Sequence, residues 1–150
     1  MTLRPAIALR QLVRSEEGSS VTELAIDPLL RAVHLAPGMR LLDVATGPGT
    51  LAAEGAGRGA QSVGVDLAPK MIALARRLHP GIAFQVADIE RLPFAADAFN
   101  ALCCAFALGH IPRPEDSLAE CMRVLKPGGR IAFSWWDDPS RQRIQGVFRE

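Results

Sequence analysis

The sequence predicts an α/β fold, with a mainly parallel sheet of about five strands, helices on both faces of the sheet and further helices at the N-terminus. Two observations lead to this fold class. Short apolar runs of strand length alternate four times with segments of helical periodicity. The connections between the runs are too long for hairpins, and such connections join parallel strands through right-handed crossovers. At 150 residues the chain fits one domain with a substantial core.

The first part of the chain is predicted to be helical. Residues 1–14 carry apolar side chains at roughly helical spacing, so they predict a short helix. A polar stretch over 15–20, with a central glycine, interrupts the pattern. A second helix is predicted over 22–35. We therefore divide the chain into an N-terminal helical extension over 1–22 and a core domain over 23–150.

The alternating elements follow from residue 40 onwards. The predicted strands are short apolar runs, as expected for strands that are buried on both faces. The predicted helices repeat apolar residues every three or four positions, and Pro69 suits the first turn of one of them. In chain order we expect a strand at 40–45, a helix at 51–60, a strand at 62–66, a helix at 69–79, strands at 82–88 and within 98–108, a helix at 115–125, a strand at 130–136 and a helix from 138.

The overall composition excludes several classes of protein. A net charge of +1, with no run of Lys or Arg, offers no electrostatic surface for nucleic acid. No apolar run reaches the roughly 18 residues that a membrane-spanning helix needs, and the N-terminus does not resemble a signal peptide. Three cysteines without metal-type spacing predict buried, reduced thiols, no metal site and a cytoplasmic protein.

A glycine turn follows the first predicted strand of the core, in the stretch "LLDVATGPGT" at 41–50. Gly47 and Gly49 can adopt backbone angles that are closed to other residues, and they let a ligand approach the main chain. The turn also opens a helix, whose first amides are unpaired donors. Two ligand classes use such a turn.

The first class is a dinucleotide. The stretch "GPGTLA" at 47–52 satisfies the G-x-G-x-x-G/A fingerprint, and Asp66 follows about 20 residues later, where a ribose-binding acid is expected. Pro48, however, removes an amide that could face a pyrophosphate. Asp43, just before the turn, would repel that group.

The second class is S-adenosylmethionine, which has an adenosine but no phosphate. Its methionine end carries an ammonium group and its sulfur is a sulfonium cation, so a carboxylate beside the turn attracts it. Asp43 is that carboxylate. The alternative role for Asp43 is a hydrogen bond to loop amides that only shapes the turn.

Four motifs resemble those of a known family. The stretches "LLDVATGPGT", "VGVDLAPKMIALARR", "VADIERLPFAADAFN" and "GHIPRPEDSLAECMRVLKPGGRIAFSWW" occur in the order and spacing of class I S-adenosylmethionine-dependent methyltransferases. The resemblance covers about residues 24–140 and is nearest the small-molecule branch that includes ubiquinone/menaquinone-biosynthesis methyltransferases. It implies a Rossmann-like, doubly wound sheet, S-adenosylmethionine as the cofactor and a small organic methyl acceptor.

The resemblance also implies roles for the matching residues. Asp43 and the backbone of Ala45–Gly49 would hold the methionine end of the cofactor. Asp66 would accept hydrogen bonds from the ribose hydroxyls, and Asp88 would accept one from the adenine amine. Each carboxylate has a structural alternative as a helix cap or a loop-shaping group. The implied cofactor-binding residues are Asp43, Ala45, Thr46, Gly47, Gly49, Asp66, Leu67, Met71, Asp88 and Ile89.

The sequence departs from the family pattern at three places. Ala45 stands where the motif D-x-G-x-G-x-G has its first glycine. Asn100 replaces a common acid, which puts only a local structural contact in doubt. The family sheet has seven strands, whereas this chain is predicted to supply only five.

The last predicted strand, over 130–136, is therefore expected to leave an unpaired sheet edge. Ile144, Val147 and Phe148 beyond it lie at helical spacing. An apolar strand with an open edge invites pairing with another chain. We expect either that the chain is a truncated form of a longer methyltransferase, which the intact motif order favours, or that it forms a homodimer through this edge.

His110 is the candidate for a catalytic side chain. Methyl transfer is an in-line displacement that depends mainly on positioning, so a general base is needed only if the acceptor must lose a proton. His110 follows the fourth predicted strand, on the ligand face of the sheet, and histidine exchanges protons near neutral pH. The alternative is that His110 only lines the pocket.

Three functions remain in competition. The first is a methyltransferase or a part of one. The second is a non-catalytic module that binds S-adenosylmethionine or another protein, which the missing strands keep open. The third is an NAD(P)-binding oxidoreductase domain, against which Asp43 and the stretch "LKPGG" at 125–129 both count.

Overall fold

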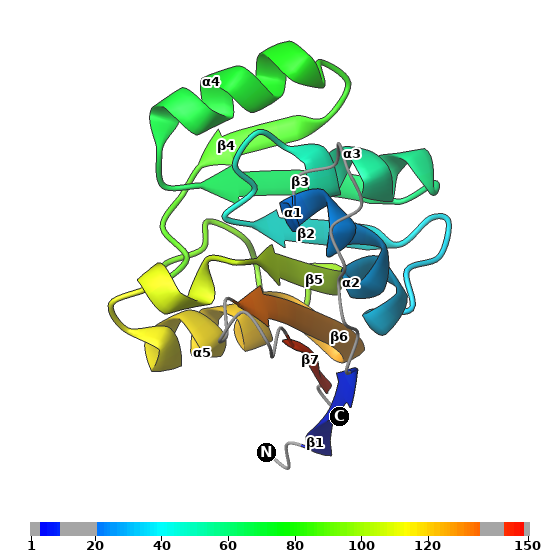
Figure 1. Cartoon of the computed structure of the whole chain (residues 1–150). Helices are drawn as coiled ribbons and strands as arrows, with labels where there is room; N and C mark the ends of the chain where they lie inside the picture. Colours follow the sequence, from blue (N-terminus) through cyan, green and yellow to red (C-terminus); the bar gives the residue numbers. More distant parts are fainter. Residues whose placement is uncertain (1–3, 10–20, 136–142, 149–150) are drawn as a thin grey trace.

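The protein folds around one seven-stranded sheet (Figure 1). The computed structural model describes residues 4–9, 21–135 and 143–148. The strands are β1 Arg4–Leu9, β2 Arg40–Val44, β3 Gln61–Asp66, β4 Ala83–Val86, β5 Phe99–Ala105, β6 Leu125–Trp135 and β7 Arg143–Phe148.

The helices lie between the strands in chain order, as the alternation of sequence patterns predicts. The helix expected over 22–35 forms as two pieces that are separated at Ala25. The helix expected over 115–125 ends one residue earlier, just before "LKPGG". The helices are α1 Val21–Leu24, α2 Ile26–Ala32, α3 Thr50–Gly57, α4 Pro69–Leu78 and α5 Pro114–Val124, with the short 3-10 helix η1 at Leu108–His110.

Five strands form the parallel part of the sheet, which confirms the predicted fold class. The strand order is β1-β7-β6-β5-β2-β3-β4. β2 pairs in parallel with both β3 and β5, β4 pairs with β3, and β6 pairs with β5. Asp43, near the end of β2, lies opposite Gly64 of β3 and Cys103 of β5. The chain order reverses between β2 and β5, which is where sheets of this kind bind ligands.

The predicted helix over 1–14 is wrong for the part that the structure describes. Arg4–Leu9 form β1, which pairs antiparallel with β7 at the edge of the sheet. Pro5 has no amide hydrogen, and an edge strand tolerates this because one of its sides makes no ladder bonds. Residues 10–20, which include the predicted polar break, lie outside the described residues.

The predicted helix from residue 138 is also wrong, because Arg143–Phe148 form β7. β7 pairs antiparallel with β6, with Ser134 opposite Ile144. A run of this length fits a helical or a strand period, and pairing with the open edge of β6 decided between them. The edge on which the expected homodimer depended is therefore paired within the chain. With β1 and β7, the sheet has seven strands instead of the expected five.

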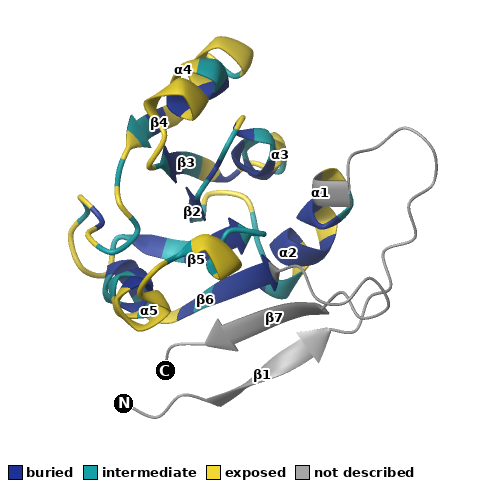
Figure 2. Ribbon diagram, turned by 60° about the vertical axis from the view of Figure 1, so that its left-hand side comes forward, coloured by how far each residue is buried: buried dark blue, intermediate teal, exposed yellow. Residues whose placement is uncertain are grey.

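The core lies on both faces of the sheet, because successive strand residues point in opposite directions. Leu41 and Cys103 pack on the face that α2 and α3 cover. Leu42 and Cys104 pack on the opposite face, against α5. Figure 2 shows these helices on either side of the sheet, with the buried residues between the layers. Burial on both faces explains why the central strands read as nearly continuous apolar runs.

All three cysteines are buried free thiols, as predicted. Burial raises the pKa of Cys103, and it raises the pKa of Cys104 to about 12, so both thiols remain protonated at neutral pH. Among the described residues, none of the helices combines the length and the apolarity needed to span a bilayer. The described residues also contain no group of three or more His, Cys, Asp or Glu side chains that could hold a metal ion.

Candidate functional site

Two cavities open at the carboxyl ends of the central parallel strands, and Ala45 lines both of them. The β2 cavity, of about 270 Å³, is lined by Asp43, by the turn over 45–48 and by side chains of α1 and α2. The β3 cavity, of about 190 Å³, is lined by the end of β3, by the loop after β4 and by the segment around η1. The two cavities therefore lie next to each other at the glycine turn.

Asp43 is the buried carboxylate of the β2 cavity, with 1% of its surface exposed. Its Oδ2 accepts a hydrogen bond of 2.6 Å from the Thr46 hydroxyl and one of 3.1 Å from the Ala52 amide. These two bonds show that Asp43 shapes the turn and the start of α3. Because Asp43 also lines the cavity, the turn-shaping role does not exclude contact with a ligand.

Burial also changes the acidity of Asp43. It raises the pKa of Asp43 to about 7, the hydrogen bonds from Thr46 and Ala52 lower it in part, and the nearby Asp66 carboxylate raises it further. In the unfolded chain the same group has a pKa near 4. Its contribution to stability is therefore fully present below about pH 4 and is lost as the pH rises through 7.

We therefore expect Asp43 to make the protein less stable at higher pH. On account of this group, the free energy of unfolding should fall by about 1 kcal/mol between pH 6 and pH 8. The Asp43→Asn variant has no carboxyl group to ionise there and should show a correspondingly smaller fall. Urea denaturation at both pH values measures the difference, and an equal fall in the two proteins would contradict the raised pKa.

The backbone of the turn is left-handed at three positions. Ala45 has φ +57°, Gly47 has φ +54° and Gly49 has φ +85°. The left-handed conformation costs a residue with a Cβ atom about 1–2 kcal/mol, which explains the family preference for glycine where this chain has Ala45. A Cβ atom at Gly47 would meet nothing within 4 Å, whereas one at Gly49 would lie 2.6 Å from Cζ of Phe84. Gly47 thus leaves open space above the turn, and Gly49 permits close packing beneath it.

Asp66 connects the turn to the end of β3. Its Oδ2 accepts a hydrogen bond of 2.9 Å from the Gly47 amide, and its Oδ1 accepts one of 2.9 Å from the Ala68 amide. A carboxylate has about four acceptor positions, so these two bonds leave room for further donors. Asp66 lines the β3 cavity and remains partly exposed.

Asp88 lies on the loop after β4, at the exposed side of the β3 cavity. Its Oδ1 accepts a hydrogen bond of 2.9 Å from the Glu90 amide, so it shapes its own loop. Arg123 of α5 holds this loop in place by donating to the Phe94 carbonyl at 2.8 Å and to the Leu92 carbonyl at 3.0 Å. The position of Asp88 therefore depends on contacts with α5.

His110 ends η1 and is exposed at the β3 cavity. Its backbone amide donates a hydrogen bond of 2.9 Å to the Ala107 carbonyl. His110 therefore shares a cavity with Asp66 and Asp88, whereas Asp43 lines the other one.

Most of the predicted site residues come together at these cavities, and two do not. Gly49 lines neither cavity and faces Phe84 instead. Met71 also lines neither cavity, although 39% of its surface is exposed. The predicted residues that line one or both cavities are Asp43, Ala45, Thr46, Gly47, Asp66, Leu67, Asp88, Ile89 and His110.

Two acids that were not predicted also line the cavities. Glu90 lies at the β3 cavity and is paired with Arg113. Glu90 lies two residues after Asp88, so the sequence could have indicated it as a candidate. Glu23 reaches the β2 cavity from α1. No local pattern around Glu23 indicates this position, which results from the packing of α1 and α2 beside the turn.

The charged side chains that line the two cavities are acidic: Glu23, Asp43, Asp66, Asp88 and Glu90. Among the described residues that line them there is no Lys and no Arg. A cleft lined by one sign of charge concentrates ligands of the opposite sign. The site therefore favours a cationic ligand and disfavours a pyrophosphate.

The chain matches the methyltransferase domain family over residues 42–133, which is more than half of its length. It is 36% identical over 119 residues to the demethylmenaquinone methyltransferase of Renibacterium salmoninarum, a match that covers 79% of this chain and 50% of that protein. The chain spans about half the length of the curated relatives it matches.

Solved structures agree with the sequence match. An S-adenosylmethionine-dependent methyltransferase from Mesorhizobium loti is 30% identical, with a TM-score of 0.68, over 76% of this chain and 55% of that one. The [4+2]-cyclase SpnF is also 30% identical, with a TM-score of 0.70, over 77% of this chain and 44% of that one. The matched range 42–133 contains the glycine turn and the carboxyl ends of the central strands. This chain belongs to the methyltransferase domain family.

Proposed function

We propose that this chain binds S-adenosylmethionine across the β2 and β3 cavities and transfers its methyl group to a small organic acceptor. The observation that carries the proposal is the acidic lining of two cavities that meet at a glycine turn. Membership of the methyltransferase domain family supports the reaction class.

The cavities suit this cofactor better than a dinucleotide. A cation beside Asp43 stabilises its ionised form, whereas a pyrophosphate between Asp43 and Asp66 would be repelled. The open space above Gly47 lets a ligand reach the turn. We assign the methionine end to the β2 cavity and the adenosine to the β3 cavity, where Leu67 and Ile89 add apolar surface.

In the proposed reaction the residues of the chain bind and orient the reactants. When bound, S-adenosylmethionine supplies an electrophilic methyl group on a sulfonium. Asp43 balances positive charge at the methionine end, and Asp66 and Asp88 accept hydrogen bonds from the ribose and the adenine amine. Holding the two reactants in line at contact distance accounts for most of the acceleration.

We propose that His110 lines the pocket and is not a general base. The His110→Ala variant should then lose little affinity for S-adenosylmethionine, because the imidazole that it removes from the lining of the β3 cavity is exposed to solvent. Its kcat with a methyl acceptor should fall by much less than a hundredfold. A loss of about a hundredfold or more, with unchanged cofactor affinity, would instead assign His110 as the general base.

Calorimetric titration with S-adenosylmethionine, S-adenosylhomocysteine and NADH tests the cofactor assignment. We expect binding of the first two and none of NADH. Tight binding of NADH without binding of S-adenosylmethionine would overturn the proposal in favour of an oxidoreductase domain.

A non-catalytic S-adenosylmethionine-binding module is the second candidate function. It is supported by the likeness to a protein that is named as a [4+2]-cyclase and not as a methyltransferase. A methyl-transfer assay separates the two candidates. Demethylmenaquinone, the compound in the names of several relatives, is the first acceptor to assay.

We also propose that residues 23–150 hold the cofactor site and that the protein works in the cytoplasm. In support of the first point, the described residues that line the two cavities run from Glu23 to Pro112. In support of the second, the three cysteines are free thiols.

A further inference from the structure

The β2 cavity has carboxylates that come from two distant parts of the chain. Asp43 is buried at the end of β2, and Glu23 is an exposed residue of α1. Oδ2 of Asp43 already accepts hydrogen bonds from Thr46 and Ala52. Glu23 therefore brings a second carboxylate to the lining of the cavity, from α1.

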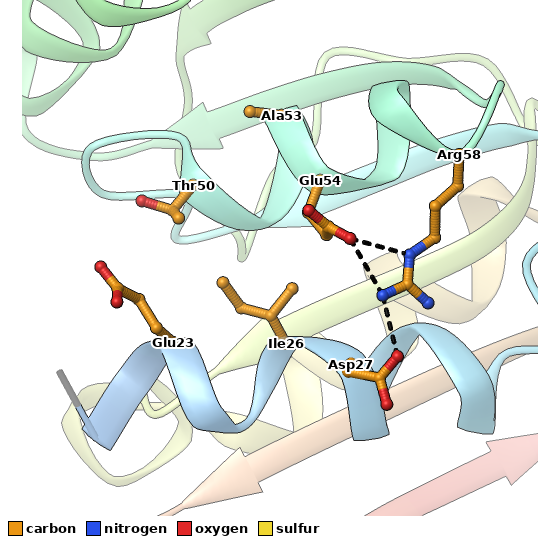
Figure 3. A pocket seen from close by; sticks show the side chains of 7 residues that line it. All are labelled: Glu23, Ile26, Asp27, Thr50, Ala53, Glu54 and Arg58. Carbon is orange, nitrogen blue, oxygen red and sulfur yellow. Dashed lines mark hydrogen bonds and ion pairs between the residues drawn. The ribbon is translucent and has the colours of Figure 1, made fainter. Parts of the chain in front are cut away.

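The position of Glu23 is set by the packing of α1 and α2 against the rest of the protein. Leu29 and Leu30 of α2 are buried in the core. On the outer side, the guanidinium of Arg58 donates to Asp27 of α2 at 2.9 Å and to Glu54 of α3 at 3.0 Å (Figure 3). These contacts hold α1 and α2 beside α3.

A larger cavity of about 410 Å³ continues outwards from the β2 cavity, between α1–α2 and α3. Glu23, Ile26 and Thr50 line both cavities, so they stand where the two join. In Figure 3 the side chain of Glu23 extends from α1 towards Thr50, the first residue of α3. Glu54 lines the outer cavity only, and its pairing with Arg58 belongs to the contacts between α2 and α3.

We propose that Glu23 binds the ammonium group at the amino-acid end of the cofactor and makes the site specific for ligands that carry it. This inference rests on the proposed function. An ammonium group that enters the β2 cavity meets two carboxylates in its lining, Asp43 from β2 and Glu23 from α1. The described residues that line this cavity include no Lys or Arg. The affinity for a nucleoside that lacks the amino-acid end should not depend on Glu23.

Calorimetry with three probes tests this role. S-adenosylmethionine and S-adenosylhomocysteine carry the ammonium group, whereas 5′-methylthioadenosine lacks the amino-acid end. The Glu23→Gln variant should bind the first two about three- to tenfold more weakly and the third unchanged, in keeping with a partly exposed charge pair. The control variant Glu115→Gln changes an exposed acid of α5 that lines none of these cavities, and it should bind all three like the wild type. Added salt should shrink the difference between the wild type and Glu23→Gln, because it screens exposed charges.

A charge-reversing variant gives a second measurement. Glu23→Lys should weaken the binding of the two ammonium-bearing probes more than Glu23→Gln does. It should leave the binding of 5′-methylthioadenosine unchanged. Equal weakening of all three probes, or no selective weakening by either variant, would overturn the inference while leaving the proposed function intact. If the wild type binds neither S-adenosylmethionine nor S-adenosylhomocysteine, the proposed function fails and this inference fails with it.

Discussion

Replacing Gly49 by alanine is expected to lower the free energy of unfolding by about 2–5 kcal/mol. Gly49 has φ +85°, and its Cβ atom would lie 2.6 Å from Cζ and 2.9 Å from Cε1 of Phe84. The left-handed backbone costs alanine about 1–2 kcal/mol, and overpacking adds about 1–3 kcal/mol. Phe84 cannot easily retreat, because it is buried in a cluster with Ile72 and Ala75.

Gly38→Ala is the matched control for this prediction. Gly38 has nearly the same backbone angle, φ +82°, but a Cβ atom there would meet nothing within 4 Å. Its replacement should cost only the backbone strain, about 1–2 kcal/mol. Urea denaturation compares the two variants. A Phe84→Leu change should recover part of the Gly49→Ala loss, and equal losses at Gly38 and Gly49 would contradict the packing argument.

The Asp66→Ala variant is expected to bind S-adenosylmethionine about 1.5–3 kcal/mol more weakly, which is roughly a 10- to 150-fold loss of affinity. In the proposed complex this carboxylate accepts hydrogen bonds from the ribose. The structure adds a second reason. Oδ2 of Asp66 accepts a hydrogen bond from the Gly47 amide, and this bond holds the turn in place. Both contributions are lost together in the alanine variant.

Calorimetry measures this affinity, and two further variants serve as controls. Asp66→Asn keeps one acceptor oxygen and should lose less affinity than Asp66→Ala. Glu115→Ala removes an exposed acid of α5 that lines neither cavity, and it should bind like the wild type. An Asp66→Ala variant that binds S-adenosylmethionine with wild-type affinity would remove Asp66 from the site.

The parallel part of the fold and much of the candidate site could be predicted because their signals are local. The run that ends in Asp43 is apolar on both faces, which indicates a strand covered by helices. Gly47 and Asp66 follow such runs, and in a parallel sheet the carboxyl ends of the strands meet at one edge. Residues that follow different strands therefore come together without any information about distant contacts.

The roles of the two turn glycines could not be separated in the same way. Gly47 and Gly49 look alike in the sequence, and both have left-handed backbones. Only the position of Phe84, which comes from β4, shows that Gly49 packs against the core while Gly47 faces open space. Such a difference depends on a neighbour that is remote in the sequence.

The amino-acid pattern alone was thus enough for the five parallel strands, the glycine turn and the acids that follow the strands. The packed structure was needed for the two outer strands and for Glu23. Arg4–Leu9 and Arg143–Phe148 are short runs that fit either period, and their pairing with each other and with β6 made them strands. Glu23 reaches the β2 cavity because α1 and α2 pack beside α3. A local pattern records which faces of an element are apolar, whereas the partner of each face is selected by contacts that form only when the whole chain folds.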